Sequence, residues 1–410
     1  MDKIRWALVG CGGMGTRHLH GMKTLLDSPF ANVEIAALCD VRAANAELAA
    51  TEVEGFTGTR PPVFSSLGEM VAQVPELQAV DVVVDPCFHH TVVCDALDLG
   101  LHVMVEKPLA ITVRGCLKMI EAAERNGRIL SVAENFRRDP SARLVHHLLE
   151  KGAIGDPYLG LFHQLGSHQK IFITPWRHMK DRGGLLLDLG VHFTDMIRYQ
   201  LGDIQEAYGD VRLASPYRTK AESFSHSLEF YRARHVEMED VVEATAEDTT
   251  TTMFRLKSGV TVSYIAGLGG HGGCGAEQIL GYDGMIQGFG SRGQRVRMKV
   301  AGGEERGQEE LLKDFPDFEL EPLAAHFFPA GVADEEGDYK LLALEHFELA
   351  EAILNGREIE VTGQEGLKDV AAVYAPFESM RAGRTVQMSE IESGALYAYQ
   401  AEIDEAIGLA

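Results

Sequence analysis

The stretch that decides the fold is IRWALVGCGGMGTRHLHGMKTLL, which covers residues 4–26. Its first six residues form an almost continuous apolar run, which is typical of a strand covered on both faces. Residues 14–26 have a helical pattern, and the turn before them has the glycine spacing G-x-G-x-x-G. In this spacing the first glycine allows a tight turn, the second lets a pyrophosphate approach the backbone, and the third lets helix and strand pack closely. The N–H groups at the start of the helix then favour the phosphates. The sequence thus predicts a dinucleotide site at Gly10, Gly12, Gly13, Met14 and Gly15.

Asp40 strengthens this interpretation, because a glycine motif alone is a weak signal. A second match to the motif, residues 267–272, is followed by no strand–helix–strand pattern, and we interpret it as a flexible loop. Asp40 instead closes the next predicted strand. A carboxylate there accepts hydrogen bonds from ribose hydroxyls and repels a 2′-phosphate, so NAD is favoured over NADP. Arg42, two residues further on, weakens that preference. The alternative to a cofactor role for Asp40 is that its side chain caps the following helix.

Residues 1–133 alternate between apolar runs and amphipathic stretches, which predicts a Rossmann domain with a doubly wound parallel sheet. The expected strands are residues 4–9, 33–39, 80–84, 102–105 and 129–133. The expected helices cover residues 14–26, 42–50, 66–73, 89–99 and 112–126. Thr112 is expected to cap the last of these helices, and Asn126-Gly127 to end it.

From residue 134 onward the pattern is that of an α+β domain with an open, mostly antiparallel sheet. Expected strands lie at 157–164, 207–213, 249–256, 259–265 and 294–300, and expected helices at 141–151, 183–202, 341–355 and 364–382. The polar stretches 214–247 and 301–340 are expected to be insertions or long loops. We therefore expect two domains, 1–133 for the nucleotide and 134–410 for substrate binding and oligomerisation. A chain of this length exceeds the roughly 250–300 residues that one core usually serves.

The charge of the chain argues against several kinds of partner. Sixty-one acidic residues against 38 basic ones give a formal net charge of −23. Such a surface repels phosphate backbones and anionic lipids, so we expect no nucleic-acid and no membrane partner. No apolar run approaches the ~18 residues of a membrane span, and the first residues lack the pattern of a signal peptide. The six cysteines are scattered without a C-x-x-C pair, which is typical of reduced thiols in a cytoplasmic protein.

A segment at 183–202, GGLLLDLGVHFTDMIRYQLG, places titratable residues on an otherwise apolar helix. Asp188, His192 and Asp195 are spaced i, i+4 and i+7, so they share one stripe of that helix. Buried polar groups need partners, so we expect the stripe to line a cavity or a functional interface.

A second signal is HVMVEKPLA at 102–110, where a predicted strand ends in Glu106-Lys107-Pro108. In doubly wound folds, ligands bind at the carboxyl ends of the strands. A lysine there is a candidate for proton transfer. Taken alone, Glu106 and Lys107 are better explained as an ordinary solvated pair.

Together these segments resemble the glucose–fructose oxidoreductase and inositol 2-dehydrogenase family of NAD(P)-dependent oxidoreductases. The resemblance covers most of the chain, and its most specific part is E-K-P combined with G-G-x-x-x-D-x-G-x-H. It is carried by GCGGMG at 10–15, DPCFHHTVVCDALDLGLHVMVEKPLA at 85–110, RRDP at 137–140, PWR at 175–177, GGLLLDLGVHFTD at 183–195, EDTTTTMFRLKSGV at 247–260 and NGREIEVTGQEGLKDVAAVYAPFESMRAGRTV at 355–386.

The resemblance implies a role for individual residues. The catalytic set is Lys107, Asp188 and His192. The cofactor is expected to meet the glycine loop, Asp40, Arg42, Pro86, His90, Glu106 and Lys107. The family's usual asparagine after this proline is Cys87 here, so Pro86 and His90 carry more weight. The substrate is expected to meet Lys107, Arg137, Trp176, Arg177, Asp188 and His192, although structural anchoring explains Trp176 and Arg177 equally well.

The implied activity is hydride transfer between NAD and a ring hydroxyl of a sugar, sugar derivative or cyclitol. His192 or Lys107 takes the hydroxyl proton, and the sequence does not choose between them. Two alternatives stay open: an NAD-requiring, redox-neutral glycosidase or lyase, and a non-catalytic ligand sensor. We expect no metal, because His89-His90 and His146-His147 are adjacent pairs that do not share a helix face. The open sheet of the second domain is expected to be covered in a homodimer or homotetramer.

Overall fold

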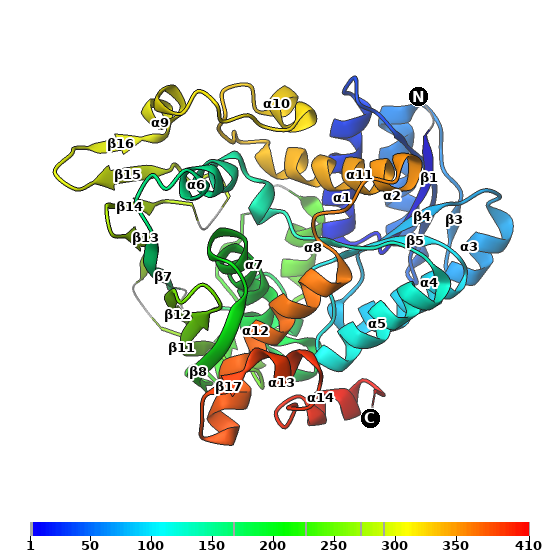
Figure 1. Ribbon diagram of the computed structural model, residues 1–410. Helices are drawn as coiled ribbons and strands as arrows, with labels where there is room; N and C mark the ends of the chain where they lie inside the picture. Colours follow the sequence, from blue (N-terminus) through cyan, green and yellow to red (C-terminus); the bar gives the residue numbers. More distant parts are fainter. Residues whose placement is uncertain (1–2, 167–168, 226–227, 271–272, 290–291, 410) are drawn as a thin grey trace. The chain divides into compact units, whose positions relative to one another are not determined.

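The computed structural model describes residues 3–166, 169–225, 228–270, 273–289 and 292–409. The chain forms two compact units. Unit 1 comprises the described residues of 1–135, 226–233 and 338–367, and unit 2 comprises the described residues of 136–225, 234–337 and 368–410 (Figure 1).

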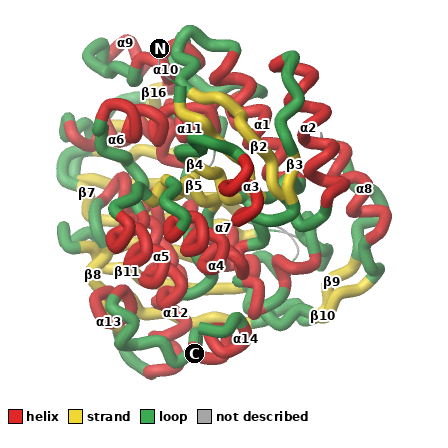
Figure 2. The backbone as a smooth tube through the Cα atoms, turned by 90° about the vertical axis from the view of Figure 1, so that its right-hand side faces the viewer, coloured by secondary structure: helices red, strands yellow, loops and turns green. Residues whose placement is uncertain are grey.

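Unit 1 is built on a six-stranded, fully parallel sheet of order β3-β2-β1-β4-β5-β6. The strands are β1 Ile4–Val9, β2 Val33–Cys39, β3 Val63–Phe64, β4 Ala79–Val82, β5 His102–Glu106 and β6 Leu130–Ala133. The helices are α1 Gly13–Leu26, α2 Ala43–Thr57, α3 Leu67–Gln73, α4 His89–Asp98 and α5 Val113–Asn126, of which α4 and α5 lie side by side (Figure 2). The doubly wound parallel sheet is therefore confirmed.

Local signals set the ends of these elements. Thr112 caps α5 by accepting a hydrogen bond from the backbone N–H of Gly115 at 3.1 Å, and Gly127 ends the helix with φ +58°. Two expectations differ from the structure: helix α2 continues to Thr57, and the two-residue strand β3 has too short an apolar run to be recognised.

Helix α11 (Gly337–Asn355) of unit 1 comes from far along the chain and runs beside α1 (Figure 1). A Cβ on Gly21 of α1 would lie 2.6 Å from Cβ of Leu342, so the two helices meet at close range. Asn32 donates hydrogen bonds to the Phe347 carbonyl (3.3 Å) and to Glu351 (3.2 Å). The sequence-based division at residue 133 does not anticipate this return of the chain.

Unit 2 contains a nine-stranded sheet of order β16-β15-β14-β13-β7-β12-β11-β8-β17, in which only β7 and β12 pair in parallel. The strands are β7 Pro157–Leu165, β8 Ile204–Arg212, β11 Thr249–Leu256, β12 Thr261–Gly267, β13 Cys274–Gly281, β14 Gly284–Gln287, β15 Arg297–Val300, β16 Glu305–Gly307 and β17 Val386–Gln387. This confirms the open, mostly antiparallel sheet. Helix α7 (Gly184–Leu201) packs on β7, β11 and β12, and 16 of its 18 residues are buried.

The remaining helices of the second half are α6 Pro140–Glu150, α9 Gln308–Asp314, α10 Pro322–Phe327, α12 Gly363–Ala382, α13 Met388–Glu392 and α14 Ala401–Ala406. The polar stretch 214–247 contains a two-stranded sheet of β9 (Tyr217–Thr219) and β10 (Val241–Glu243), and helix α8 (Glu229–Glu237). The predicted loop at 267–272 lies partly outside the described residues. Among the described helices, none is both long and apolar enough to cross a membrane.

Candidate active site

In the glycine loop after β1, backbone contacts exclude a side chain at two positions. Gly10 adopts φ +101°, and a Cβ there would lie 2.5 Å from the carbonyl oxygen of Val83. A Cβ on Gly15 would clash with the carbonyl oxygen of Gly10. The turn and the close helix–strand packing predicted from the spacing are therefore the reasons for these two glycines.

The start of α1 fits an anionic group. Its N-cap is Gly12, no side chain caps it, and its first turn carries no acidic residue. Backbone N–H groups at such a helix start favour a phosphate. Asp40 stands directly after β2, and its carboxylate accepts hydrogen bonds from the backbone N–H groups of Cys11 and Arg42, each at 2.8 Å. Asp40, which would contact the ribose, is thus hydrogen-bonded to the glycine loop, which would bind the phosphates.

The loop after β4 carries Pro86 and His90. Pro86 opens a single 3₁₀ turn, Pro86–Phe88, and His90 lies in the first turn of α4 and is 5% exposed. Burial, more than the nearby Lys118, lowers the pKa of His90. The neighbouring His89 was not expected to matter, yet its two ring nitrogens lie 2.9 Å from the Pro108 carbonyl and 3.2 Å from the Val84 carbonyl. His89 therefore links this loop to the E-K-P segment.

Glu106 ends β5 as a buried residue, and Lys107 beside it is half-buried. The Glu106 carboxylate lies 3.2 Å from Nε2 of His18, whose Nδ1 lies 2.8 Å from Asp81. His346 of α11 reaches the same Asp81 oxygen through Nε2 at 3.0 Å. These four side chains form a buried network, which we call the His18 cluster.

The charges of the His18 cluster stabilise one another. Burial alone would lower the pKa of His18, but the negative charge of Asp81 and hydrogen bonds to Asp81 and Glu106 raise it to about 10. Burial opposes ionisation of Asp81, but His18 and His346 lower its pKa to about 2. His18, Asp81 and His346 also have the composition of a metal site. The 2.8 and 3.0 Å contacts are hydrogen-bond lengths, and we interpret the cluster as a hydrogen-bonded network.

In unit 2, the stripe on α7 exists as predicted, and each member has a specific neighbour. Asp188 accepts a hydrogen bond from Nε of Arg177 at 2.8 Å, in a pair that is about nine-tenths buried. The Arg177 guanidinium also lies 4.3 Å from the centre of the Trp176 ring. The PWR segment forms the 3₁₀ turn Pro175–His178, which packs on α7. Trp176 and Arg177 are thereby placed next to Asp188.

His192 lies one turn after Asp188 and is 7% exposed. Its imidazole stacks on the ring of Phe136, with centroids 4.0 Å apart and planes 6° apart. The Arg292 guanidinium lies 5.2 Å from the centre of the Phe136 ring. Phe136 was not expected as a site residue, although it directly precedes the RRDP motif, and it fixes the plane of the imidazole.

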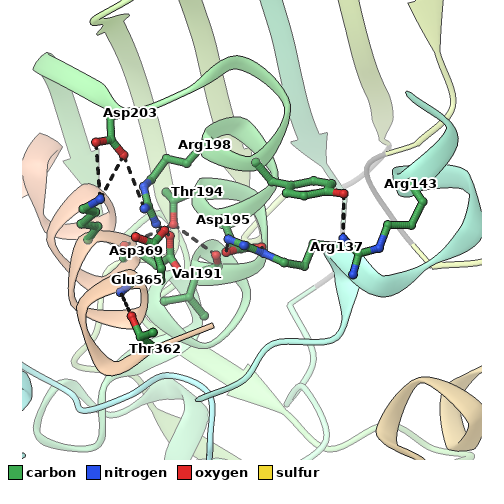
Figure 3. A network of polar contacts seen from close by, with 12 residues as sticks. Arg137, Arg143, Val191, Thr194, Asp195, Arg198, Asp203, Thr362, Glu365 and Asp369 are labelled. Atoms are coloured by element: carbon green, nitrogen blue, oxygen red, sulfur yellow. Dashed lines mark hydrogen bonds and ion pairs between the residues drawn. The ribbon is translucent and has the colours of Figure 1, made fainter. Parts of the chain in front are cut away.

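Arginine–aspartate pairs anchor α7 (Figure 3). Asp195 is fully buried and binds Arg137 through two contacts, one of them 2.9 Å long. One turn further on, Arg198 binds Asp369 of α12 at 2.5 Å and lies 3.5 Å from Asp203. Burial raises the pKa of Asp369, while Arg198 opposes that rise. Arg137, expected to meet the substrate, is 6% exposed and is engaged by Asp195.

The predicted catalytic set is thus divided between the units. Lys107 belongs to unit 1 with the glycine loop, Asp40, Pro86 and His90. Asp188 and His192 belong to unit 2 with Arg137, Trp176 and Arg177. Phe136 stacks on His192, and His18 contacts Glu106, the residue before Lys107. Both contacts join residues that are far apart in the sequence, which explains why spacing alone did not reveal them.

Comparison with known proteins gives matches along most of the chain. A curated D-apiose dehydrogenase from Paraburkholderia graminis is 27% identical over 410 aligned residues, covering 96% of this chain and 92% of that protein. A protein of glycosyl hydrolase family 109 from Akkermansia muciniphila is 28% identical over 176 residues, which cover 42% of this chain and 36% of that protein. The solved structure of a levoglucosan dehydrogenase in complex with NADH has a TM-score of 0.74 at 21% identity, covering 94% of this chain and 99% of that one.

Two family descriptions match consecutive parts of the chain. Residues 4–134 match the oxidoreductase family with an NAD-binding Rossmann fold, and residues 142–287 match the GFO/IDH/MocA C-terminal domain. The cofactor indicated by the glycine loop and Asp40 is therefore NAD. With both domains matched, this chain belongs to the GFO/IDH/MocA family of oxidoreductases.

Proposed function

We propose that the protein is an NAD-dependent oxidoreductase that moves a hydride between the nicotinamide and a ring hydroxyl of a sugar, sugar derivative or cyclitol. The observation that carries this proposal is the buried pair Asp188 and His192 on α7, oriented by Arg177 and Phe136. Residues 1–133 hold the cofactor and residues 134–410 hold the substrate and the oligomer contacts.

The bound nicotinamide would supply the hydride acceptor. The chain supplies the proton acceptor, which is the imidazole of His192 or the amine of Lys107. The stack on Phe136 restricts the imidazole to one plane, so a proton can be taken from one direction without reorganisation of the ring. Asp188, held by Arg177, accepts a hydrogen bond from a substrate hydroxyl, and Trp176 offers an apolar face to the sugar ring. Arg137 acts as a positioning residue by holding Asp195 and thereby α7.

The named relatives support the substrate class. One is a D-apiose dehydrogenase and a structural neighbour is a levoglucosan dehydrogenase, and both names refer to uncharged carbohydrates. A net charge of −23 also disfavours a phosphorylated sugar.

A second candidate function is redox-neutral cleavage of a glycoside, in which transient oxidation drives elimination. The similarity to a glycosyl hydrolase family 109 protein, confined to 42% of this chain, favours it. The two functions differ in their use of NAD, because a dehydrogenase consumes it in step with substrate whereas the cleavage needs only catalytic amounts.

The deciding experiment follows absorbance of reduced nicotinamide while the protein meets free sugars, inositols and glycosides with NAD and, separately, NADP. A sustained rise with one compound class would support the dehydrogenase and identify its substrate class. Cleavage of a glycoside without that rise would support the second function. If no compound changes, the proposal of an enzyme acting on these substrates fails and a ligand sensor is favoured.

The preference for NAD over NADP is expected to depend on the carboxylate of Asp40. Replacing it by serine removes the charge that repels a 2′-phosphate, so the ratio of the NADP to the NAD dissociation constant should fall by about tenfold. Fluorescence titration with NADH and NADPH measures both constants. Asp314→Ser, at an exposed aspartate on α9 in unit 2, is the matched control, and an unchanged ratio in Asp40→Ser would exclude Asp40 as the determinant.

The open face of the nine-stranded sheet is the proposed oligomer contact. Paired strands place Tyr208, Met253, Ser263, Leu161 and Gln278 in one row across it, and Tyr208 and Met253 are 57% and 44% exposed. A broad sheet face with exposed apolar side chains is suited to a second copy related by a two-fold axis.

Tyr208→Asp/Met253→Asp should convert a dimer or tetramer into a smaller species, since burying two carboxylates at an interface is costly. Light scattering with size-exclusion chromatography measures the mass. Tyr282→Asp, at a tyrosine that is 75% exposed and lies in the turn between β13 and β14, should leave the mass unchanged. A wild-type monomer would overturn the oligomer proposal.

A further inference from the structure

The sequence GCGGMG contains one glycine that the G-x-G-x-x-G spacing does not require, Gly13. The structure shows why a side chain is excluded there. A Cβ on Gly13 would clash with the ring of Tyr231, lying 2.6 Å from Cε2 and 2.8 Å from Oη. These distances are far below any normal Cβ contact, so the close approach of Tyr231 and the additional glycine are matched features of the chain.

Tyr231 does not act alone. It lies on α8 and is 7% exposed, and the ring of the preceding Phe230 meets it edge-to-face with centroids 5.7 Å apart. Phe230 lies beside the neighbouring glycine, because a Cβ on Gly12 would lie 3.6 Å from its Cζ. The polar insertion 214–247 thus places two aromatic rings against the first residues of α1.

The position of these rings is the chemically important point. Gly12 and Gly13 are the N-cap and first residue of α1, whose uncapped start suits the cofactor's phosphates. Aromatic rings beside this site exclude water, which strengthens the attraction between helix start and phosphate. Rings packed against this turn would obstruct the exit of a phosphate bound there, so release would require α8 to move.

We propose that Phe230 and Tyr231 form an aromatic cover over the dinucleotide loop and slow the release of NAD. The proposal rests on NAD binding at residues 10–15 and is independent of the substrate. A slowly released cofactor would let one nicotinamide serve successive reactions, which a redox-neutral cycle requires and a dehydrogenase does not.

The test measures NADH dissociation from the full-length protein by stopped-flow fluorescence, with excess NAD added to displace it. Tyr231→Ala should raise the dissociation rate constant by about tenfold or more, with a smaller change in the association rate constant. Tyr231→Phe keeps the ring and should stay within about twofold of the parent. Val236→Ala, on the same helix but 77% exposed, is the matched control and should change neither constant.

A double-mutant cycle tests the contact itself. Gly13→Ala should raise the dissociation rate constant by displacing Tyr231, yet should have little further effect in the Tyr231→Ala background, where the space is open. Equal effects of Gly13→Ala in both backgrounds would overturn the cover. So would an unchanged dissociation rate in Tyr231→Ala, or tighter NADH binding, which would show that the ring competes with the cofactor. Failure of NADH to bind the parent protein would refute the cofactor assignment instead.

Discussion

Replacing His192 by asparagine or Lys107 by methionine should lower kcat by about two orders of magnitude or more, because each change removes a group placed to exchange a proton. The dissociation constant for NADH should stay within a few-fold of the parent value. Steady-state kinetics on the substrate identified by the nicotinamide assay measures the first quantity, and fluorescence titration measures the second.

The two variants also distinguish whether His192 or Lys107 is the base. The variant that lacks the base should lose the rise of kcat/KM with pH on the acidic side, whereas the other variant should keep it. Lys299→Met, at an exposed lysine on β15, is the matched control for Lys107 and should retain full activity. Near-normal turnover in either site variant would remove that residue from the mechanism.

Turnover also depends on the residues that hold α7 in place, because α7 carries Asp188 and His192. Arg137 and Asp195 are buried together, and Arg198 with Asp369 is buried further along the helix. His192 lies one turn before Asp195, so movement of that pair displaces the imidazole. This geometry explains why Arg137, in a motif that the family resemblance linked to substrate, is placed to act through the helix.

How far the sequence predicted the structure depended on the range of the interactions. The glycine loop, Asp40, the cap at Thr112 and the stripe on α7 follow local spacing, and the structure contains all four features. Strands β1, β2 and β11 end where their apolar or alternating patterns end.

Long-range features were not accessible in the same way. The His18 cluster joins residues 18, 81, 106 and 346, and no single segment shows that these side chains meet. The polar composition of 214–247 suggested a loop, whereas Tyr231 within it packs against the glycine turn. The additional glycine at position 13 makes room for Tyr231, but this contact cannot be inferred from the sequence of the loop alone.

The largest expected effect on stability comes from the His18 cluster. Asp81→Asn removes the charge between His18 and His346 and should lower the free energy of unfolding by about 3–5 kcal/mol, since it breaks a fully buried ion pair. Urea unfolding measures this quantity. The matched control is Glu54→Gln, which breaks the exposed pair of Arg60 and Glu54 and should cost less than about 1 kcal/mol.

The pH dependence of stability gives a second, independent signature of the same pair. The pKa of His18 rises from 6.5 to about 10 on folding, so its stabilisation is complete below pH 6.5 and is lost as pH rises through 10. The pKa of Asp81 falls from 3.8 to about 2, so its contribution is complete above pH 3.8 and is lost as pH falls through 2. The pair therefore stabilises most between pH 3.8 and 6.5, and Asp81→Asn should flatten the decline above pH 6.5. An unchanged decline in that variant would show that other groups cause it. A fall in the parent's melting temperature on adding a chelator would show that a metal ion, rather than hydrogen bonds, joins the cluster.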